Sequence, residues 1–123
     1  TTLFRSKKLS MTQTAYQYNP YILIACGTEK EEYARAMLSK ASNSLLEVRG
    51  IKATFTIGRV SKTMVAISAR SAKDINVQII MENMGGGGHF SMAAAQFENQ
   101  TIEDVRLLLE EKIKEYLEDR GEV

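Results

Sequence analysis

Half of the chain's eight glycines stand in one run, Gly85 to Gly88, and the only histidine, His89, follows them directly. Four ordered glycines are costly, because glycine loses more backbone freedom on folding than any other residue. A functional gain is therefore expected. Without side chains, backbone N–H groups can approach an anionic ligand, and His89 can add a hydrogen bond or a positive charge. The alternative is a flexible loop with a histidine on the surface.

Two observations favour ligand binding over a flexible loop. The glycine run lies between apolar segments rather than in a serine-rich linker, and Arg70 stands alone at the end of a predicted strand upstream. The common phosphate motifs do not fit, because the third glycine position of G-x-G-x-x-G falls on Ser91 and no Gly-Lys-Ser or Gly-Lys-Thr occurs. The sequence predicts neither a dinucleotide-binding fold nor a P-loop.

The other reactive residues are predicted to be structural. A metal site at His89 would need partner ligands, and the nearest carboxylates in the sequence are those of Glu82 and Glu98. Cys26 lies in an apolar run, which is typical of a small buried side chain rather than a reactive thiol. We therefore expect no metal or cofactor to be bound by this chain.

The elements that would position these residues follow from hydrophobic periodicity and capping signals. Three capping-box spacings, Thr28 with Glu31, Ser71 with Asp74 and Thr101 with Asp104, mark helix starts. Strands are expected at residues 21–26, 51–57, 63–69 and 92–97, and helices at residues 28–48, 71–84 and 101–120. This order predicts an α/β fold, a mixed β-sheet covered by helices.

Some of these segments allow a second interpretation. Residues 75–79 also alternate as a strand would, and the alanines at 93–95 favour a helix. In residues 51–57 apolar side chains alternate with Lys52, Thr54 and Thr56, which predicts a half-exposed strand. Residues 1–20 have no clean period and are interpreted as a linker or edge segment from a preceding domain, with the main domain at residues 21–120.

Composition limits the functional classes. The chain has 123 residues with 16 Lys and Arg against 15 Asp and Glu, a balance that argues against a protein that coats RNA or DNA. One cysteine excludes an internal disulfide and fits a reducing compartment, so the cytosol is expected. No apolar run approaches the roughly 18 to 20 residues that span a bilayer. The chain starts at Thr1 rather than Met, and we expect a piece of a longer protein.

Three segments together resemble a known family. The run from Met84 through the glycines and His89 to Gln96, with residues 67–71 and 74–77, resembles the DHH-associated C-terminal subdomain of DHH-superfamily phosphoesterases. The Gly-Gly-Gly-His core is shared with nanoRNases, phosphoadenosine-phosphate phosphatases, RecJ-like nucleases and alanyl-tRNA synthetases. Met84 before the glycines, and Ala-Ala-Ala-Gln after them, are most similar to the membrane-anchored bacterial cyclic-di-AMP phosphodiesterases of the GdpP type.

The resemblance implies a nucleotide-recognition role. The implied substrate-binding residues are Ser68, Arg70, Asn76, Gly86, Gly87, Gly88 and His89. It also implies a strand after the histidine, which favours the strand at residues 92–97. The Asp-His-His motif is absent, so the catalytic residues and the manganese ions are expected in a preceding DHH domain.

The expected substrate of the parent protein is cyclic-di-AMP, or a short oligonucleotide. The parent is expected at the cytoplasmic side of a bacterial cell membrane, and a homodimer is an open alternative. A nanoRNase or phosphoadenosine-phosphate phosphatase is the second interpretation, and a non-catalytic nucleotide-sensing or docking module is the third.

Overall fold

The computed structural model describes residues 2–72 and 74–121, with side chains from Arg5 onward. Its described part contains ten elements: α1 (Thr2–Gln13), β1 (Tyr16–Asn19), β2 (Ile22–Cys26), α2 (Arg35–Leu46), β3 (Ala53–Arg59), β4 (Met64–Ser71), α3 (Val77–Glu82), β5 (Gly87–His89), β6 (Met92–Glu98) and α4 (Ile102–Asp119). The strands form one sheet in the order β1-β2-β3-β4-β6-β5. Only β2 and β3 pair in parallel, which confirms the mixed α/β sheet.

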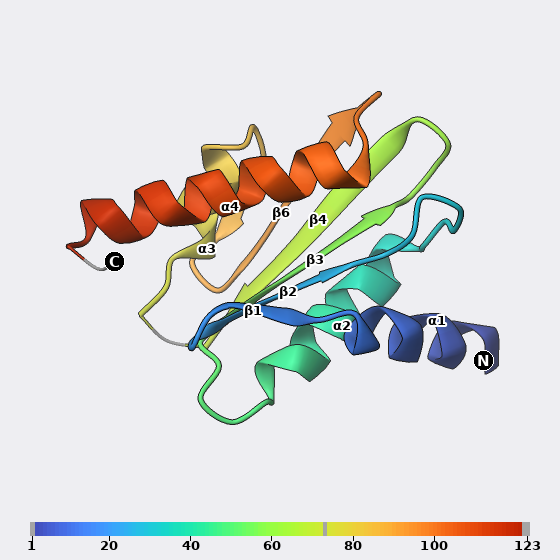
Figure 1. Cartoon of the computed structure of the whole chain (residues 1–123), viewed down its shortest axis with the longest axis horizontal. Helices are drawn as coiled ribbons and strands as arrows, with labels where there is room; N and C mark the ends of the chain where they lie inside the picture. The colour runs from blue at the N-terminus through green and yellow to red at the C-terminus, as the bar shows by residue number, and fades with distance from the viewer. Residues whose placement is uncertain (1, 73, 122–123) are drawn as a thin grey trace.

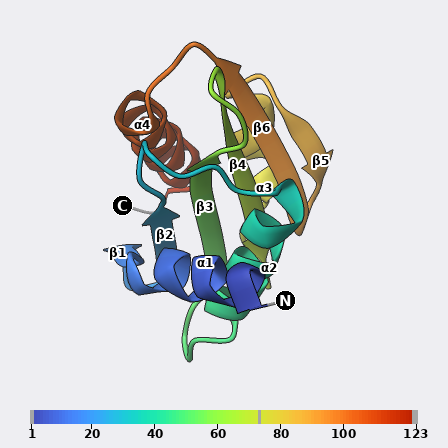
Figure 2. The same cartoon turned by 90° about the vertical axis from the view of Figure 1, so that its right-hand side faces the viewer.

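The helices cover the two faces of the sheet unequally. In Figure 1, α3 and α4 lie above the sheet and α1 and α2 lie below it. Each face carries its own apolar core, the larger one under α3 and α4 and the smaller one between the sheet, α1 and α2. Helix α2 packs mainly on β3 and β4, so β6 and β5 extend past it toward the edge of the sheet (Figure 2).

Strand β3 is buried on both faces, so the prediction of a half-exposed strand is wrong. Thr54 and Thr56 are 0% exposed. The Thr54 hydroxyl donates to the carbonyl oxygen of Ser42 at 2.8 Å, and the Thr56 hydroxyl donates to that of Leu38 at 2.8 Å. Threonine fits a buried strand here because α2 supplies hydrogen-bond acceptors that satisfy both hydroxyls.

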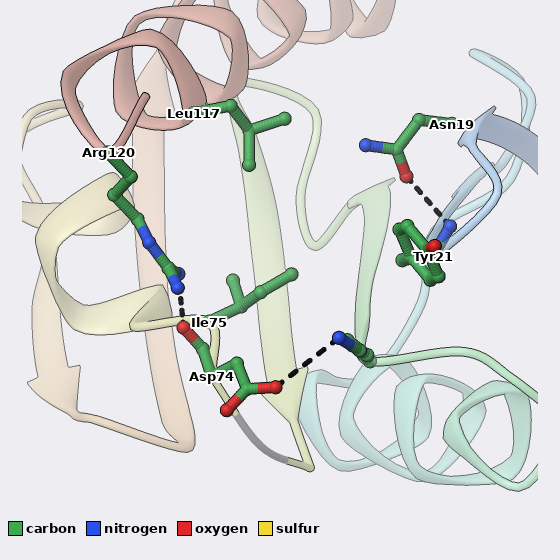
Figure 3. Close-up of a pocket in the computed structure, with 7 residues that line it drawn as sticks. Asn19, Tyr21, Asp74, Ile75, Leu117 and Arg120 are labelled. Atoms are coloured by element: carbon green, nitrogen blue, oxygen red, sulfur yellow. Dashed lines mark hydrogen bonds and ion pairs between the residues drawn. The ribbon is translucent and has the colours of Figure 1, made fainter. Parts of the chain in front are cut away.

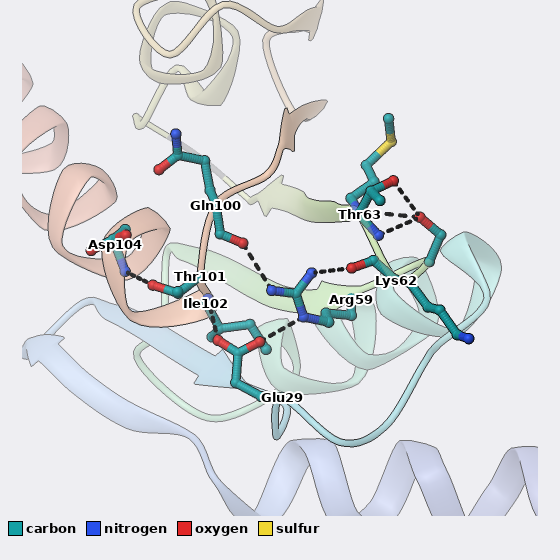
Figure 4. Close-up of polar contacts among 10 residues, drawn as sticks. Glu29, Arg59, Lys62, Thr63, Gln100, Thr101, Ile102 and Asp104 are labelled. Atoms are coloured by element: carbon teal, nitrogen blue, oxygen red, sulfur yellow. Dashed lines mark hydrogen bonds and ion pairs between the residues drawn. The ribbon is translucent and has the colours of Figure 1, made fainter.

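Helix α2 begins seven residues later than the expected start at Thr28. The reason is tertiary: Glu29 does not serve the first turn of a helix but accepts a hydrogen bond from Arg59 Nε at 2.6 Å and another from the backbone N–H of Ile102 at 2.7 Å (Figure 4). These contacts hold the segment before α2 beside β3, where Glu32 forms an isolated bridge with Arg59. Of the apolar residues that recur at helical spacing in the predicted helix, Ala34 is exposed and the others are buried: Tyr33, Met37, Leu38, Ala41 and Leu45.

The second capping box is also wrong. Helix α3 begins at Val77, and its N-cap is Asn76, whose side-chain oxygen accepts from two backbone N–H groups. Ser71 instead donates to the carbonyl oxygen of Phe90 at 3.3 Å, and Asp74 has a φ of 67°, which ends any helix there. The third box is confirmed, because Thr101 Oγ1 accepts from the N–H of Asp104 at 3.0 Å.

The N-terminal segment holds two elements that its sequence pattern did not predict. Helix α1 packs on α2, and β1 adds an edge strand to β2. Thr1, the first residue of the predicted linker, lies outside the described residues. Among the residues of α1 with described side chains, Met11 is the buried apolar one. A single buried position gives no periodic signal in that part of the sequence.

Candidate functional site

The predicted glycine loop forms an edge strand rather than a flexible loop. Residues Gly87–His89 make β5, which pairs antiparallel with β6. Two of the glycines allow this close pairing. A Cβ at Gly86 would stand 2.1 Å from the carbonyl oxygen of Ala94, and one at Gly88 would stand 2.5 Å from Ala93 Cα. Gly85 and Gly88 also have positive φ values, 85° and 147°, which favour glycine.

Gly87 differs from its neighbours in the run. Its φ lies outside the positive range, and a Cβ added to it would meet nothing within 4 Å. The fold therefore does not need a glycine at this position. The missing side chain instead leaves the backbone of β5 open to close approach from outside, which is what a glycine at a ligand-binding position provides.

The strand register gathers four of the predicted residues on one face of the sheet. Arg70 of β4 pairs with Met92 of β6, and Met92 pairs with His89 of β5. In the next row, Ser68 pairs with Ala94, which pairs with Gly87. Residues directly opposite in antiparallel strands point to the same face. Arg70, Met92 and His89 thus form one row, with Ser68, Ala94 and Gly87 beside it.

This face is open to solvent over β6 and β5. Met92 is 52% exposed, and Ala94, His89 and Gln96 are exposed as well. The opposite face of β6 carries Ala93 and Ala95, which are buried under α3 and α4. We refer to the solvent-open side, defined by Arg70, Met92, His89, Ser68, Ala94 and Gly87, as the open face.

Arg70 lies at the open face as a partly buried cation without an acidic partner in the described part of the chain. Its Nη1 donates to the carbonyl oxygen of Ala69 at 2.9 Å and to Ser68 Oγ at 3.3 Å. Its Nε is buried and has no hydrogen-bond partner among the described residues. Burial lowers the pKa of the Arg70 guanidinium, because its charge is held away from water. An anionic ligand would supply the missing charge and hydrogen bonds.

Ser68 supports this arginine rather than facing solvent. The side chain is only 6% exposed, and its Oγ lies 3.2 Å from Ser39 Oγ of α2. It accepts from Arg70 through the same atom. The structure thus places Ser68 where it orients the guanidinium toward the open face.

The other three predicted residues do not join the open face through their side chains. Asn76 caps α3, which packs on the opposite core, and its side-chain oxygen is used by Gln78 and Ile79. Gly86 and Gly88 are explained by their close contact with β6. Sequence reasoning missed Met92, whose place between Arg70 and His89 follows only from the register. The predicted strand at 92–97 was the available signal, because it put residues 92, 94 and 96 on one face.

Comparison with known proteins identifies the family. Residues 18–119 match the DHHA1 domain. The chain belongs to the DHHA1 domain family. It is 41% identical over 97 residues to the cyclic-di-AMP phosphodiesterase GdpP of Geobacillus thermodenitrificans, covering 79% of this chain and 15% of that protein. It is 39% identical over 99 residues to the cyclic-di-AMP phosphodiesterase PdeA of Listeria monocytogenes, covering 80% of this chain and 15% of that protein. The chain therefore spans about a seventh of the length of these relatives.

A solved structure shares the fold of this DHHA1 domain. An exopolyphosphatase-related protein from Bacteroides fragilis superposes with a TM-score of 0.80 at 18% sequence identity, over 92% of this chain and 34% of that protein. The fold class and the resemblance to the cyclic-di-AMP phosphodiesterases are thereby confirmed. No helix among the described residues of the DHHA1 domain has the length and apolarity needed to cross a membrane.

A metal centre needs several donor side chains gathered at one place. The described residues of the DHHA1 domain contain no group of three or more His, Cys, Asp and Glu side chains that could hold an ion. His89 lies at the edge of the sheet beside glycines, and Cys26 is a thiol whose pKa burial raises to about 11. These residues do not fit a manganese site, so no catalytic step is assigned to a metal held by this chain.

A cavity with no predicted role lies away from the open face. It has a volume of about 380 Å³ and opens between the β1–β2 turn, the start of α3 and the end of α4 (Figure 3). Lys52 and Asp74 form an ion pair of 3.3 Å at its wall. None of the seven predicted residues lines this cavity. Arg70, which has no acidic partner among the described residues, does not lie at this cavity.

Proposed function

We propose that this DHHA1 domain is the nucleotide-recognition half of a metal-dependent phosphodiesterase that hydrolyses cyclic-di-AMP to the linear dinucleotide. Two relatives that are 41% and 39% identical to it over the aligned residues are named cyclic-di-AMP phosphodiesterases. The observation that carries the proposal is Arg70, a partly buried arginine whose Nε has no hydrogen-bond partner among the described residues, in a row with His89 beside the open backbone of Gly87.

The open face suits one phosphate group of a nucleotide. A guanidinium can donate two parallel hydrogen bonds to a phosphate, and Ser68 holds Arg70 in place for this contact. His89 can donate from the opposite side of the row. Gly87 lets the phosphate and the sugar approach β5 without a steric clash. The chain's own residues therefore bind and orient the substrate.

The chemical step belongs elsewhere in this proposal. Bound metal ions would supply an activated water and charge stabilisation for the leaving oxygen. The described residues gather no ligand set for such ions, so we place the manganese in a preceding DHH domain of the same parent chain. The parent protein is proposed to be anchored in the bacterial membrane with this domain on the cytoplasmic side.

The test compares the full-length parent with the present chain. In the parent, His89→Ala and Arg70→Ala should each lower kcat/KM for cyclic-di-AMP by about tenfold to a hundredfold, because each removes a hydrogen bond to a charged group. The 123-residue chain should bind nucleotides weakly and not hydrolyse them. If both variants of the parent retain wild-type kcat/KM, the pocket is elsewhere. Metal-dependent cleavage by the chain alone would contradict the division of labour.

The same assay separates the alternative functions. A parent that hydrolyses short RNA or phosphoadenosine phosphate faster than cyclic-di-AMP would belong to the nanoRNase or phosphatase interpretation. A parent that binds cyclic-di-AMP through Arg70 without turnover would be a sensing module. Either result would replace the proposed reaction while leaving the open face as the binding site.

A further inference from the structure

A second hollow adjoins the open face and has no assigned role. It has a volume of about 240 Å³ and is lined by Arg35, Gly85, Gly86, Ala94, Ala95 and Gln96. We call it the Arg35 cleft. Ala94 belongs both to this cleft and to the open face, so the two are continuous. Ligand pockets for whole drug-sized molecules measure about 300 to 1,000 Å³, so a cleft of this size fits one group of a larger ligand.

The glycine and alanine walls of the Arg35 cleft are poor in free donors. Four of its six residues are glycine or alanine, which present backbone and methyl groups only. The backbone N–H of Gly85 is already bonded to the carbonyl oxygen of Glu82 at 3.0 Å, and that of Gly86 to the carbonyl oxygen of Met81 at 2.8 Å. A phosphate would therefore find no free amide from these glycines. A flat aromatic ring, by contrast, can pack against these walls without a hydrogen bond from a backbone amide.

The two polar side chains of the cleft are both planar. The Nη2 of Arg35 donates to the Met64 sulfur at 3.2 Å, and sulfur is a weak acceptor. No ion pair of Arg35 occurs in the described part of the structure. A guanidinium held in this way offers its plane for stacking on a base. The Gln96 amide is exposed and can both donate and accept, which suits the N6 and N7 atoms of adenine.

The spacing links the cleft to the phosphate site. Gln96 lies two residues beyond Ala94, which is opposite Gly87, and this step is about 7 Å along a strand. A phosphate above Arg70 and Gly87 and a base above Gln96 would leave room for the sugar between them. We propose that the Arg35 cleft is the adenine subsite of this domain, in which Arg35 stacks on the base and Gln96 reads its edge. This inference rests on the proposed function, because it takes the phosphate to lie at Arg70.

The experiment measures the binding of three probes to the 123-residue chain by NMR titration. The probes are AMP, GMP and ribose 5-phosphate, which lacks a base. Gln96→Ala should weaken AMP binding by about tenfold toward the level of GMP, because a paired amide contact is lost. Arg35→Lys keeps the charge but loses the plane, so it should weaken both nucleotides and leave ribose 5-phosphate unchanged. Gln17→Ala on β1 and Arg49→Ala beyond α2, both exposed positions, are the matched controls and should change nothing.

The outcomes distinguish the two proposals. If Arg35→Lys or Arg35→Ala weakens ribose 5-phosphate as much as AMP, the cleft binds phosphate and the adenine assignment is overturned. If Arg70→Ala weakens all three probes but the Arg35 and Gln96 variants weaken none, the inference fails and the proposed phosphate site stands. If Arg70→Ala has no effect on any probe, the proposed function itself fails. Folding is not at issue, because Arg35 and Gln96 are exposed.

Discussion

Two arginines at opposite ends of the β3–β4 hairpin have opposite environments. Arg59 ends β3 near the hairpin turn and has a partner for each of three nitrogens: the Glu29 carboxylate at 2.6 Å, the carbonyl oxygen of Lys62 at 3.2 Å and that of Gln100 at 2.9 Å. Arg70, near the end of β4, bonds only Ala69 and Ser68 through one nitrogen, and its Nε has no partner in the described structure.

The difference separates a structural arginine from one that is available to a ligand. The Arg59 contacts connect three segments far apart in sequence, because Glu29 also accepts from the first N–H of α4 (Figure 4). Removing Arg59 breaks three hydrogen bonds to exposed acceptors that connect these segments. Removing Arg70 breaks no ion pair. A partly buried charge that the fold leaves uncompensated is costly, and a bound anion offsets that cost.

The largest expected effect comes from Gly87→Val. A branched side chain at this open position should block the approach of a ligand to β5, so nucleotide binding by the chain should fall below detection in an NMR titration. The free energy of unfolding should change by no more than about 0.5 kcal/mol, as for other surface sites. Gly86→Val is the contrasting variant, because its Cβ would collide with the Ala94 carbonyl and should destabilise the fold. Normal binding by Gly87→Val would remove the open face from consideration.

The next largest effect is on AMP binding, which should depend on Arg70 and not on Arg59. Arg70→Ala should weaken AMP binding by about tenfold to a hundredfold, the cost of losing a hydrogen bond to a charged group. Arg70→Lys should give an intermediate loss, because it keeps the charge without the fork. Arg59→Ala should bind AMP as the wild type does. The comparison breaks down if Arg59→Ala weakens binding as strongly as Arg70→Ala.

The effect on stability should be the reverse, larger for Arg59→Ala than for Arg70→Ala. Arg59→Ala should lower the free energy of unfolding by about 1 kcal/mol, measured by urea denaturation, because it removes three hydrogen bonds between distant segments although water can reach their exposed acceptors. Arg70→Ala should change it by no more than about 0.5 kcal/mol. A large loss for Arg70→Ala would mean that the guanidinium is a structural group after all.

The smallest effect uses Cys26 as a reporter of the Arg59 region. Burial raises the pKa of the Cys26 thiol to about 11, so little thiolate exists at pH 8. The alkylation rate should therefore rise about tenfold per pH unit between pH 8 and pH 10, because only the thiolate reacts. Arg59→Ala should speed alkylation several-fold by loosening the segment that follows β2, and Arg70→Ala should not. A rate that levels off near pH 9 would contradict the raised pKa.

Much of the fold was available from the sequence because it depends on local periodicity. The buried strand β2 and the helix α4 with its Thr101 cap followed from apolar spacing and one capping signal, whereas the strand β6 followed from the family resemblance. The two failed capping boxes have a common cause. Glu29, inside the first box, and Ser71, the first residue of the second, have partners 30 and 19 residues away in the sequence, and no local pattern encodes such partners.

The candidate site divides in the same way. The sequence by itself determined that Arg70, the glycine run and His89 were the residues to examine, because an isolated charge and four glycines are unusual wherever the chain folds. Only the tertiary structure decided which of them belong together. The antiparallel register places Arg70, Met92 and His89 in one row. It also packs Gly86 and Gly88 closely against β6, whereas Gly87 has open space beside it. Register depends on pairing between distant strands, so it is a property of the assembled sheet and not of any segment alone.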